Sequence, residues 1–148
     1  MDFFNFIFGN KKDITRKINF EDVQILLKKS DSILLNTINT SRQNCLIKKT
    51  LAAEKEEMFI RKLIDSNNFS TYIIVYGENC NENKIFEKYN QLIGLGFMNV
   101  YVYTGGLFEW LCLQDIYGKE EFPTTSMELD ILKYRPKSIF QNLMLTNE

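Results

Sequence analysis

Histidine is absent from this chain of 148 residues. Without it there is no Ser-His-Asp or Cys-His catalytic group and no histidine metal ligand. The three cysteines, Cys45, Cys80 and Cys112, lie far apart and have no CxxC spacing, whereas a structural zinc site needs four Cys or His ligands. We therefore expect no metal and no cofactor. Sparse cysteine without a secretory signal is typical of a reducing compartment, so we expect a cytoplasmic protein.

An excess of charge of either sign is also missing. The 18 basic and 19 acidic residues give a net charge of −1, which provides no basic field for nucleic acid or anionic lipid. We therefore expect no nucleic-acid partner and no membrane binding, and the sequence does not indicate an oligomeric state.

Long hydrophobic runs are lacking as well. The apolar residues 3–8 are interrupted by Asn5, and this run is far too short to span a bilayer. These aromatic residues either fold back onto the domain, which we favour, or dock onto a partner or a membrane surface. The second alternative would use the basic residues that follow them, which are Lys11, Lys12, Arg16 and Lys17.

What the chain has is an alternation of helical and strand-like segments. Amphipathic periodicity predicts helices over 20–29, 50–67 and 83–97. We expect Asn19 to be the N-cap of the first helix and Lys49 or Thr50 to begin the second. Gly94 and Gly96 are expected to end the third. A turn and helix are predicted over 104–118. Apolar runs predict strands over 32–36, 45–47, 71–76 and 99–103. This order predicts one α/β domain with a mainly parallel central sheet.

Five motifs follow one another in the second half of the chain: "TYIIVY", "GENCNEN", "KIFEKYNQLIGLGF", "MNVYVYT" and "GGLFEW". In this order they resemble the second half of a rhodanese-like domain. The resemblance implies a three-layer sandwich, with a central mainly parallel sheet flanked by helices. The first half departs from the family pattern, since residues 36–38 replace an Asp-x-Arg motif and residues 44–47 replace a Gly-His-Ile element. We expect an arm over 1–18, the domain over 19–140 and a tail over 141–148.

The resemblance implies an active loop between the central strand and the next helix. In active members a cysteine directly follows that strand, and the loop N–H groups hold its thiolate or persulfide. Gly77 stands at that place, and Cys80 comes three residues later, although counting back from "LGF" puts Cys80 near the expected position. The loop residues are Gly77, Glu78, Asn79, Asn81, Glu82, Asn83 and Lys84, and Gly105, Gly106 and Trp110 are expected beside them.

Charge argues against catalysis by Cys80. Glu78 and Glu82 oppose both the ionisation of a nearby thiol and the approach of an anionic sulfur donor. We therefore predict a binding or regulatory module with weak or no sulfurtransferase activity. The alternative is an active thiosulfate-type sulfurtransferase with a persulfide on Cys80, assisted by Lys84. We expect Cys45 and Cys112 to be buried. The segment over 107–125 is rich in aromatic side chains. Those that the core does not bury are candidates for a surface that binds a protein partner.

Overall fold

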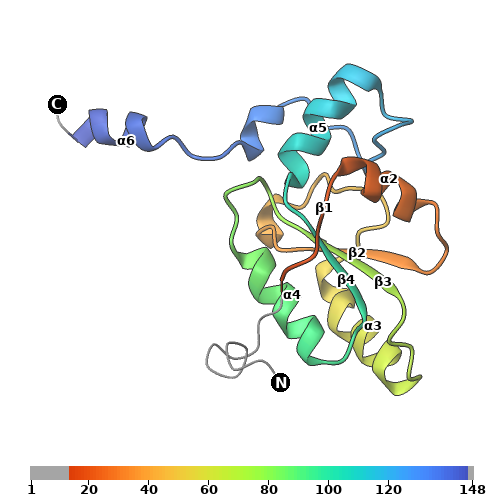
Figure 1. Cartoon of the computed structure of the whole chain (residues 1–148). Coiled ribbons are helices and arrows are strands. Elements are labelled where there is room, and N and C mark those ends of the chain that lie inside the picture. The colour runs from red at the N-terminus through yellow and green to blue at the C-terminus, as the bar shows by residue number, and fades with distance from the viewer. Residues whose placement is uncertain (1–13, 147–148) are drawn as a thin grey trace.

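Four parallel strands form the centre of the structure, a computed structural model that describes residues 14–146 except for the side chains of 142, 145 and 146 (Figure 1). The strands are β1 (Lys17–Ile18), β2 (Ser32–Asn36), β3 (Tyr72–Tyr76) and β4 (Asn99–Tyr103), and their order in the sheet is β1-β4-β3-β2. All three pairings are parallel, so the carboxyl ends of the strands meet at one edge of the sheet.

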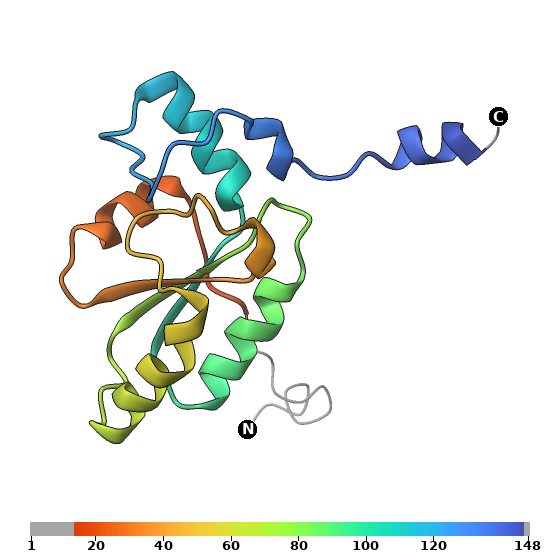
Figure 2. The same cartoon turned by 180° about the vertical axis from the view of Figure 1, so that it is seen from behind.

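Two pairs of helices cover the two faces of the sheet (Figures 1 and 2). Helices α2 (Phe20–Leu27) and α5 (Gly106–Tyr117) pack on one face, and α3 (Ala53–Asp65) and α4 (Lys84–Gly94) pack on the other. Each face has its own apolar core, because alternate residues of the central strands point to opposite sides. The predicted three-layer α/β sandwich with a parallel central sheet is therefore confirmed.

The local predictions for the helix ends have mixed outcomes. Asn19 caps α2 in a capping box with Asp22, as predicted. Helix α4 ends at Gly94, and Gly96 follows with a φ of 105°, also as predicted. The predicted start of α3 is wrong, since this helix begins at Ala53 and Lys49 has a φ of 72°, outside helical geometry.

Two strand predictions also differ from the structure. The predicted strand over 45–47 is wrong, because this segment forms one isolated bridge, between Ile47 and Thr124, and among the described residues it pairs with no strand of the sheet. The N–H of Ile47 donates to the side-chain hydroxyl of Tyr76 instead. Strand β1 was not predicted. Residues 17 and 18, which belong to the predicted arm, pair with β4 and so extend the sheet. Residues 1–13 of that arm lie outside the described part of the chain.

The last part of the chain crosses the carboxyl edge of the sheet and then leaves the sandwich. The short helix η2 (Ile131–Tyr134) packs near α5, and α6 (Ile139–Thr146) projects away from the sheet (Figures 1 and 2). The predicted boundaries of arm, domain and tail stay predictions. Among residues 14–146, no helix has both the length and the apolarity needed to cross a membrane.

Candidate functional site

The loop over residues 77–83 is anchored on the beginning of helix α5. The backbone N–H groups of Leu107 and Phe108 donate to the carbonyl oxygens of Gly77 at 2.9 Å and Glu78 at 2.8 Å. Gly106 has a φ of 71°, and a Cβ there would lie 2.8 Å from the backbone nitrogen of Asn79. The turn into α5 therefore requires glycine at this position, both for its conformation and for the close approach of the loop.

Asn79 organises the turn of the loop. Its Nδ2 donates to the carbonyl oxygen of Tyr134 at 2.9 Å, and its Oδ1 accepts from the backbone N–H of Asn81 at 2.9 Å. Its own carbonyl oxygen accepts from the N–H of Glu82 at 3.2 Å. Asn79 therefore connects the loop both to itself and to η2. Asn83, in contrast, is the N-cap of α4 but makes no side-chain capping hydrogen bond.

Cys80 lies on the exposed outer side of this turn. The one hydrogen bond that its thiol makes within the described part of the chain is a long contact of 3.9 Å with the Oδ1 of Asn81. Residues before and after Cys80 line the cavity beside the loop, but Cys80 does not. The loop therefore presents the thiol to solvent rather than to the cavity.

The first position of the loop has no room for a side chain. Gly77 is buried, and a Cβ there would lie 2.5 Å from the Cγ of Glu82 and 3.0 Å from the Oγ1 of Thr37. The side chain of Glu82 thus occupies the space directly after β3. A larger residue at position 77 requires Glu82 to move.

A polar cavity of about 810 Å³, called the loop pocket below, lies between this loop, the segment after β2 and the segment over 133–141. Its cationic lining residues are Arg42, Lys84, Lys133, Arg135 and Lys137, and its carboxylates are Glu78 and Glu82. The loop alone is acidic, as the sequence predicted. The folded pocket has an excess of positive charge, because the segment over 133–137 brings three cations over the loop.

Arg42 joins the three segments that surround the loop pocket. Its Nε and Nη2 donate to the Oε1 of Glu78 at 2.9 and 2.8 Å, and its Nη2 also donates to the carbonyl oxygen of Lys133 at 2.6 Å. Its guanidinium lies 5.5 Å from the centre of the Tyr134 ring. Glu78 is therefore neutralised by a residue that is distant in sequence and that the loop's own composition does not reveal.

The other cysteines and Trp110 belong to the scaffold. Cys45 is buried as predicted, and burial raises the pKa of its thiol. Cys112 is only half-buried, so its predicted burial is wrong; its side chain lies towards the outer side of α5. Desolvation raises the pKa of its thiol, with smaller effects of Asp115 and Glu109. Trp110 is buried, and its Nε1 donates to the carbonyl oxygen of Pro123 at 3.1 Å.

Sequence reasoning missed Arg42, Lys133, Arg135 and Lys137. A signal existed for Arg42, since it follows β2, and the carboxyl ends of neighbouring parallel strands meet at one edge of the sheet. No pattern placed residues 133–137 there. Within the described ranges, the acidic and cysteine side chains form no group of three or more that is able to hold a metal ion.

No protein-family model matches the sequence, and no curated protein matches it. Solved structures do. A crystal structure of the Alr3790 protein from Anabaena sp. is 21% identical, with a TM-score of 0.54 over 88% of this chain and 94% of that chain. A solution structure of the rhodanese-like domain of the same protein is 22% identical, with a TM-score of 0.54 over 84% of this chain and 87% of that chain.

An enzyme structure is similar as well. The thiosulfate sulfurtransferase from Pseudomonas aeruginosa is 17% identical, with a TM-score of 0.54 over 81% of this chain, which corresponds to 23% of that chain. The chain therefore has a rhodanese-like fold.

Proposed function

We propose that this chain is a rhodanese-like binding module that receives an anionic group in the loop pocket and does not turn over sulfur. The observation that carries the proposal is the pair of positions Gly77 and Cys80. A glycine without space for a side chain directly follows β3, and the cysteine of the loop lies outside the pocket.

The absence of turnover follows from where a nucleophile has to be. In active rhodanese-like domains, as the sequence resemblance implies, the reactive cysteine directly follows the central strand, which is the place of Gly77 here. The Cβ and Cγ of Glu82 fill that space. The carboxylate that they carry opposes both a thiolate and an anionic donor nearby. Cys80 is exposed, and its sulfur faces the side chain of Asn81 instead of a ring of N–H groups.

Recognition of an anion is supported by the charges that line the pocket. Arg42 is paired with Glu78, and Lys133 is paired with Glu128 at 3.4 Å. Lys84, Arg135 and Lys137 form no ion pair with any carboxylate of residues 14–146. These three cations face a single unpaired carboxylate, Glu82, so a bound anion gains a net attraction.

A titration of the full chain with sulfate tests the recognition of anions. We expect saturable shifts in the amide resonances of residues 78–84 and 133–138, and affinity reduced about fivefold or more in the double variant Arg135→Gln/Lys137→Gln, since each removed charge weakens the attraction. Lys28→Gln, an exposed lysine at the end of α2, is the matched control and should bind sulfate like the unmodified chain. Equal affinity in all three proteins would contradict anion binding in this pocket.

The alternative, an active sulfurtransferase with a persulfide on Cys80, is favoured by one observation, the access of solvent to the thiol. Intact-mass measurement after treatment with thiosulfate separates the two. We expect no added sulfur on the chain. One added sulfur that is missing in Cys80→Ser, but present in Cys112→Ser, would favour the enzyme.

A further inference from the structure

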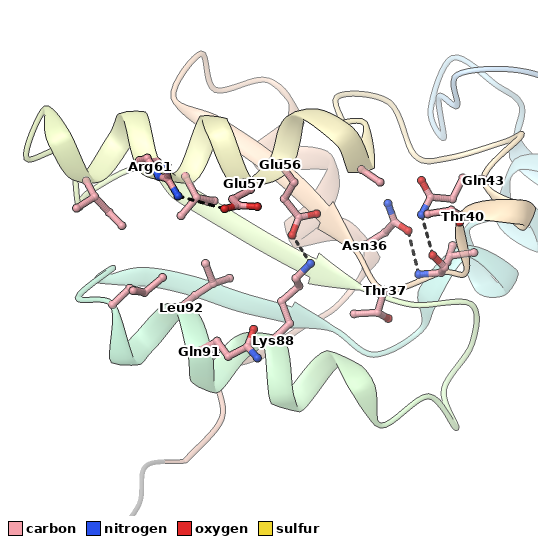
Figure 3. Close-up of a pocket in the computed structure, with 15 residues that line it drawn as sticks. Asn36, Thr37, Thr40, Gln43, Glu56, Glu57, Arg61, Lys88, Gln91 and Leu92 are labelled. Atoms are coloured by element: carbon pink, nitrogen blue, oxygen red, sulfur yellow. Dashed lines mark hydrogen bonds and ion pairs between the residues drawn. The ribbon is translucent and has the colours of Figure 1, made fainter.

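A second cavity lies between helices α3 and α4, on the face of the sheet that does not carry α5 (Figure 3). Its volume is about 560 Å³, and we call it the helix groove. Apolar side chains of Ile60 and Ile64 from α3 and of Leu92 from α4 form its walls, together with Leu95 directly after α4. The groove is within the range of sizes that small-molecule sites have in proteins, roughly 300–1,000 Å³.

The charged side chains of the helix groove neutralise one another. Lys88 of α4 reaches across to Glu56 of α3, and both side chains are largely buried. Along the rim, Arg61 binds Glu57 at 3.2 Å (Figure 3). Each cation of the groove is thus paired with one carboxylate, so the groove has no excess of charge of either sign. The groove therefore differs from the loop pocket, with its excess of positive charge.

The inner end of the groove contains one donor without a partner. Asn36 is 5% exposed, and its Oδ1 accepts from the backbone N–H of Ile38 at 2.9 Å. Its Nδ2 donates to no other group among residues 14–146. The hydroxyl of Thr37 does not serve the groove, because its Oγ1 is fully buried and lies beside Gly77, 3.0 Å from where a Cβ would stand there. The polar groups of buried side chains are nearly always hydrogen-bonded, so the unpartnered Nδ2 of Asn36 at one end of a cavity indicates a ligand atom there.

We propose that the helix groove binds a small, neutral, amphiphilic molecule. Its aliphatic or aromatic body lies between Ile60, Ile64 and Leu92, and its head group accepts a hydrogen bond from the Nδ2 of Asn36. A carbonyl or hydroxyl oxygen meets this requirement. The paired charges of Lys88 and Arg61 favour a head group without charge, because a carboxylate there has no unpaired cation to offset its desolvation.

Octanamide serves as the probe, since it combines an aliphatic body with a neutral amide head. It is titrated into the full chain by calorimetry and by amide chemical shifts. We expect saturable binding with shifts at residues of α3 and α4. Octanoate, which has a similar length and a negative charge, should bind at least about fivefold more weakly than the amide. Tighter binding of octanoate, or no saturation by octanamide, would overturn the proposal.

Blocking the groove gives a second test with a control on the same helix. Ile60→Trp places a large ring between α3 and α4 and should weaken octanamide binding more than about tenfold. Met58→Trp puts the same ring on the outer side of α3, where Met58 is exposed, and should leave the affinity unchanged. If Ile60→Trp folds and binds octanamide normally, the groove is not the site.

A segment of the chain itself is the competing occupant. If octanamide binds only after deletion of residues 1–12, the aromatic N-terminal segment occupies the groove, and the proposal of a small-molecule site is overturned. If the full chain and the shortened chain bind octanamide equally, the proposal is supported.

Discussion

Strands β3 and β4 end side by side, in register at Tyr76 and Tyr103, and the segments that follow them are very different. After Tyr103, the chain needs only Thr104 and Gly105 before α5 begins. After Tyr76, the loop over 77–83 leads to α4 and exposes Cys80 on the way. The short turn is specified by a local glycine, whereas the long loop is held by residues from other parts of the chain.

The two tyrosines show the same contrast. The hydroxyl of Tyr103 donates to the Oε1 of Glu109 at 2.7 Å, six residues further along the chain in the first turn of α5. The hydroxyl of Tyr76 accepts from the backbone N–H of Ile47 at 3.1 Å and contacts the Oγ1 of Thr50 at 2.7 Å, both distant in sequence. Local sequence therefore determines one strand end, and tertiary contacts determine the other.

The largest expected effect comes from Gly106→Ala. A Cβ at this position would lie 2.8 Å from backbone atoms of Gly77 and Asn79, and the φ of 71° is strained for alanine. We expect the free energy of unfolding to fall by about 3 kcal/mol, measured by denaturant titration. Because the clash is with the loop, amide exchange over 77–83 should also accelerate.

Gly94→Ala is the control for Gly106→Ala. No heavy atom within 4 Å would meet a Cβ at Gly94, which is the last residue of α4. Alanine has the higher helix propensity, so stability should stay equal or rise by up to about 0.5 kcal/mol. Equal losses in both variants would contradict the close contact between the turn and the loop.

Alkaline pH tests the two strand ends together. Burial raises the pKa of Tyr76, and burial followed by the hydrogen bond to Glu109 raises the pKa of Tyr103. Above the ordinary pKa of about 10, the unfolded chain loses these protons while the folded chain keeps them, so stability falls as pH rises. We expect each tyrosine to contribute a loss of about 1 kcal/mol between pH 10 and 11.

The variants Tyr76→Phe and Tyr103→Phe separate these contributions. Each should reduce the dependence of the unfolding free energy on pH above 10 by one tyrosine's share, because phenylalanine has no proton to lose. If both variants keep the full dependence, the two hydroxyl groups are not protected from ionisation in the folded chain.

Arg42→Ala removes the residue that joins the loop to the segments around it. It loses two hydrogen bonds to Glu78, one to the carbonyl of Lys133 and the contact with the Tyr134 ring. We expect a loss of about 1–2 kcal/mol, since the pair is partly exposed. The double variant with Glu78→Gln should lose less than the sum of the single losses. Strict additivity would show that the pair does not act as a unit.

Cys80→Ser should have the smallest effect. An exposed side chain with one weak contact contributes little, so the change in stability should stay within about 0.5 kcal/mol. Cys45→Ala, at the buried cysteine, should cost about 1–2 kcal/mol through the lost packing. A large loss in Cys80→Ser would mean that the thiol faces the interior.

The fold was predictable from the sequence because its signals are local. The apolar runs of β3 and β4, the stripe of α4 and the capping residue Asn19 each report on their own neighbourhood. Strand β1 was missed since two residues carry no periodicity, and it is recognisable only through its pairing with β4. The segment 45–47 is apolar like a strand, but its backbone pairs with Thr124 and Thr125 instead of with a strand of the sheet.

The candidate site was predictable only in part, for the same reason. The loop and the glycine turn were found from their residues, but the charge of the pocket was not. Arg42 and the cations over 133–137 reach the loop only through tertiary structure, whereas the residues of the loop by themselves carry a negative charge. The unpartnered Nδ2 of Asn36 likewise becomes visible only in the folded structure.

A thiosulfate:cyanide sulfurtransferase assay measures whether the exposed Cys80 works as a nucleophile. The assay compares the unmodified chain with Cys80→Ser and with Cys112→Ser as the matched control. We predict that all three proteins give the same rate as buffer without protein. Turnover by the unmodified chain and by Cys112→Ser that disappears in Cys80→Ser would show instead that Cys80 is a catalytic nucleophile.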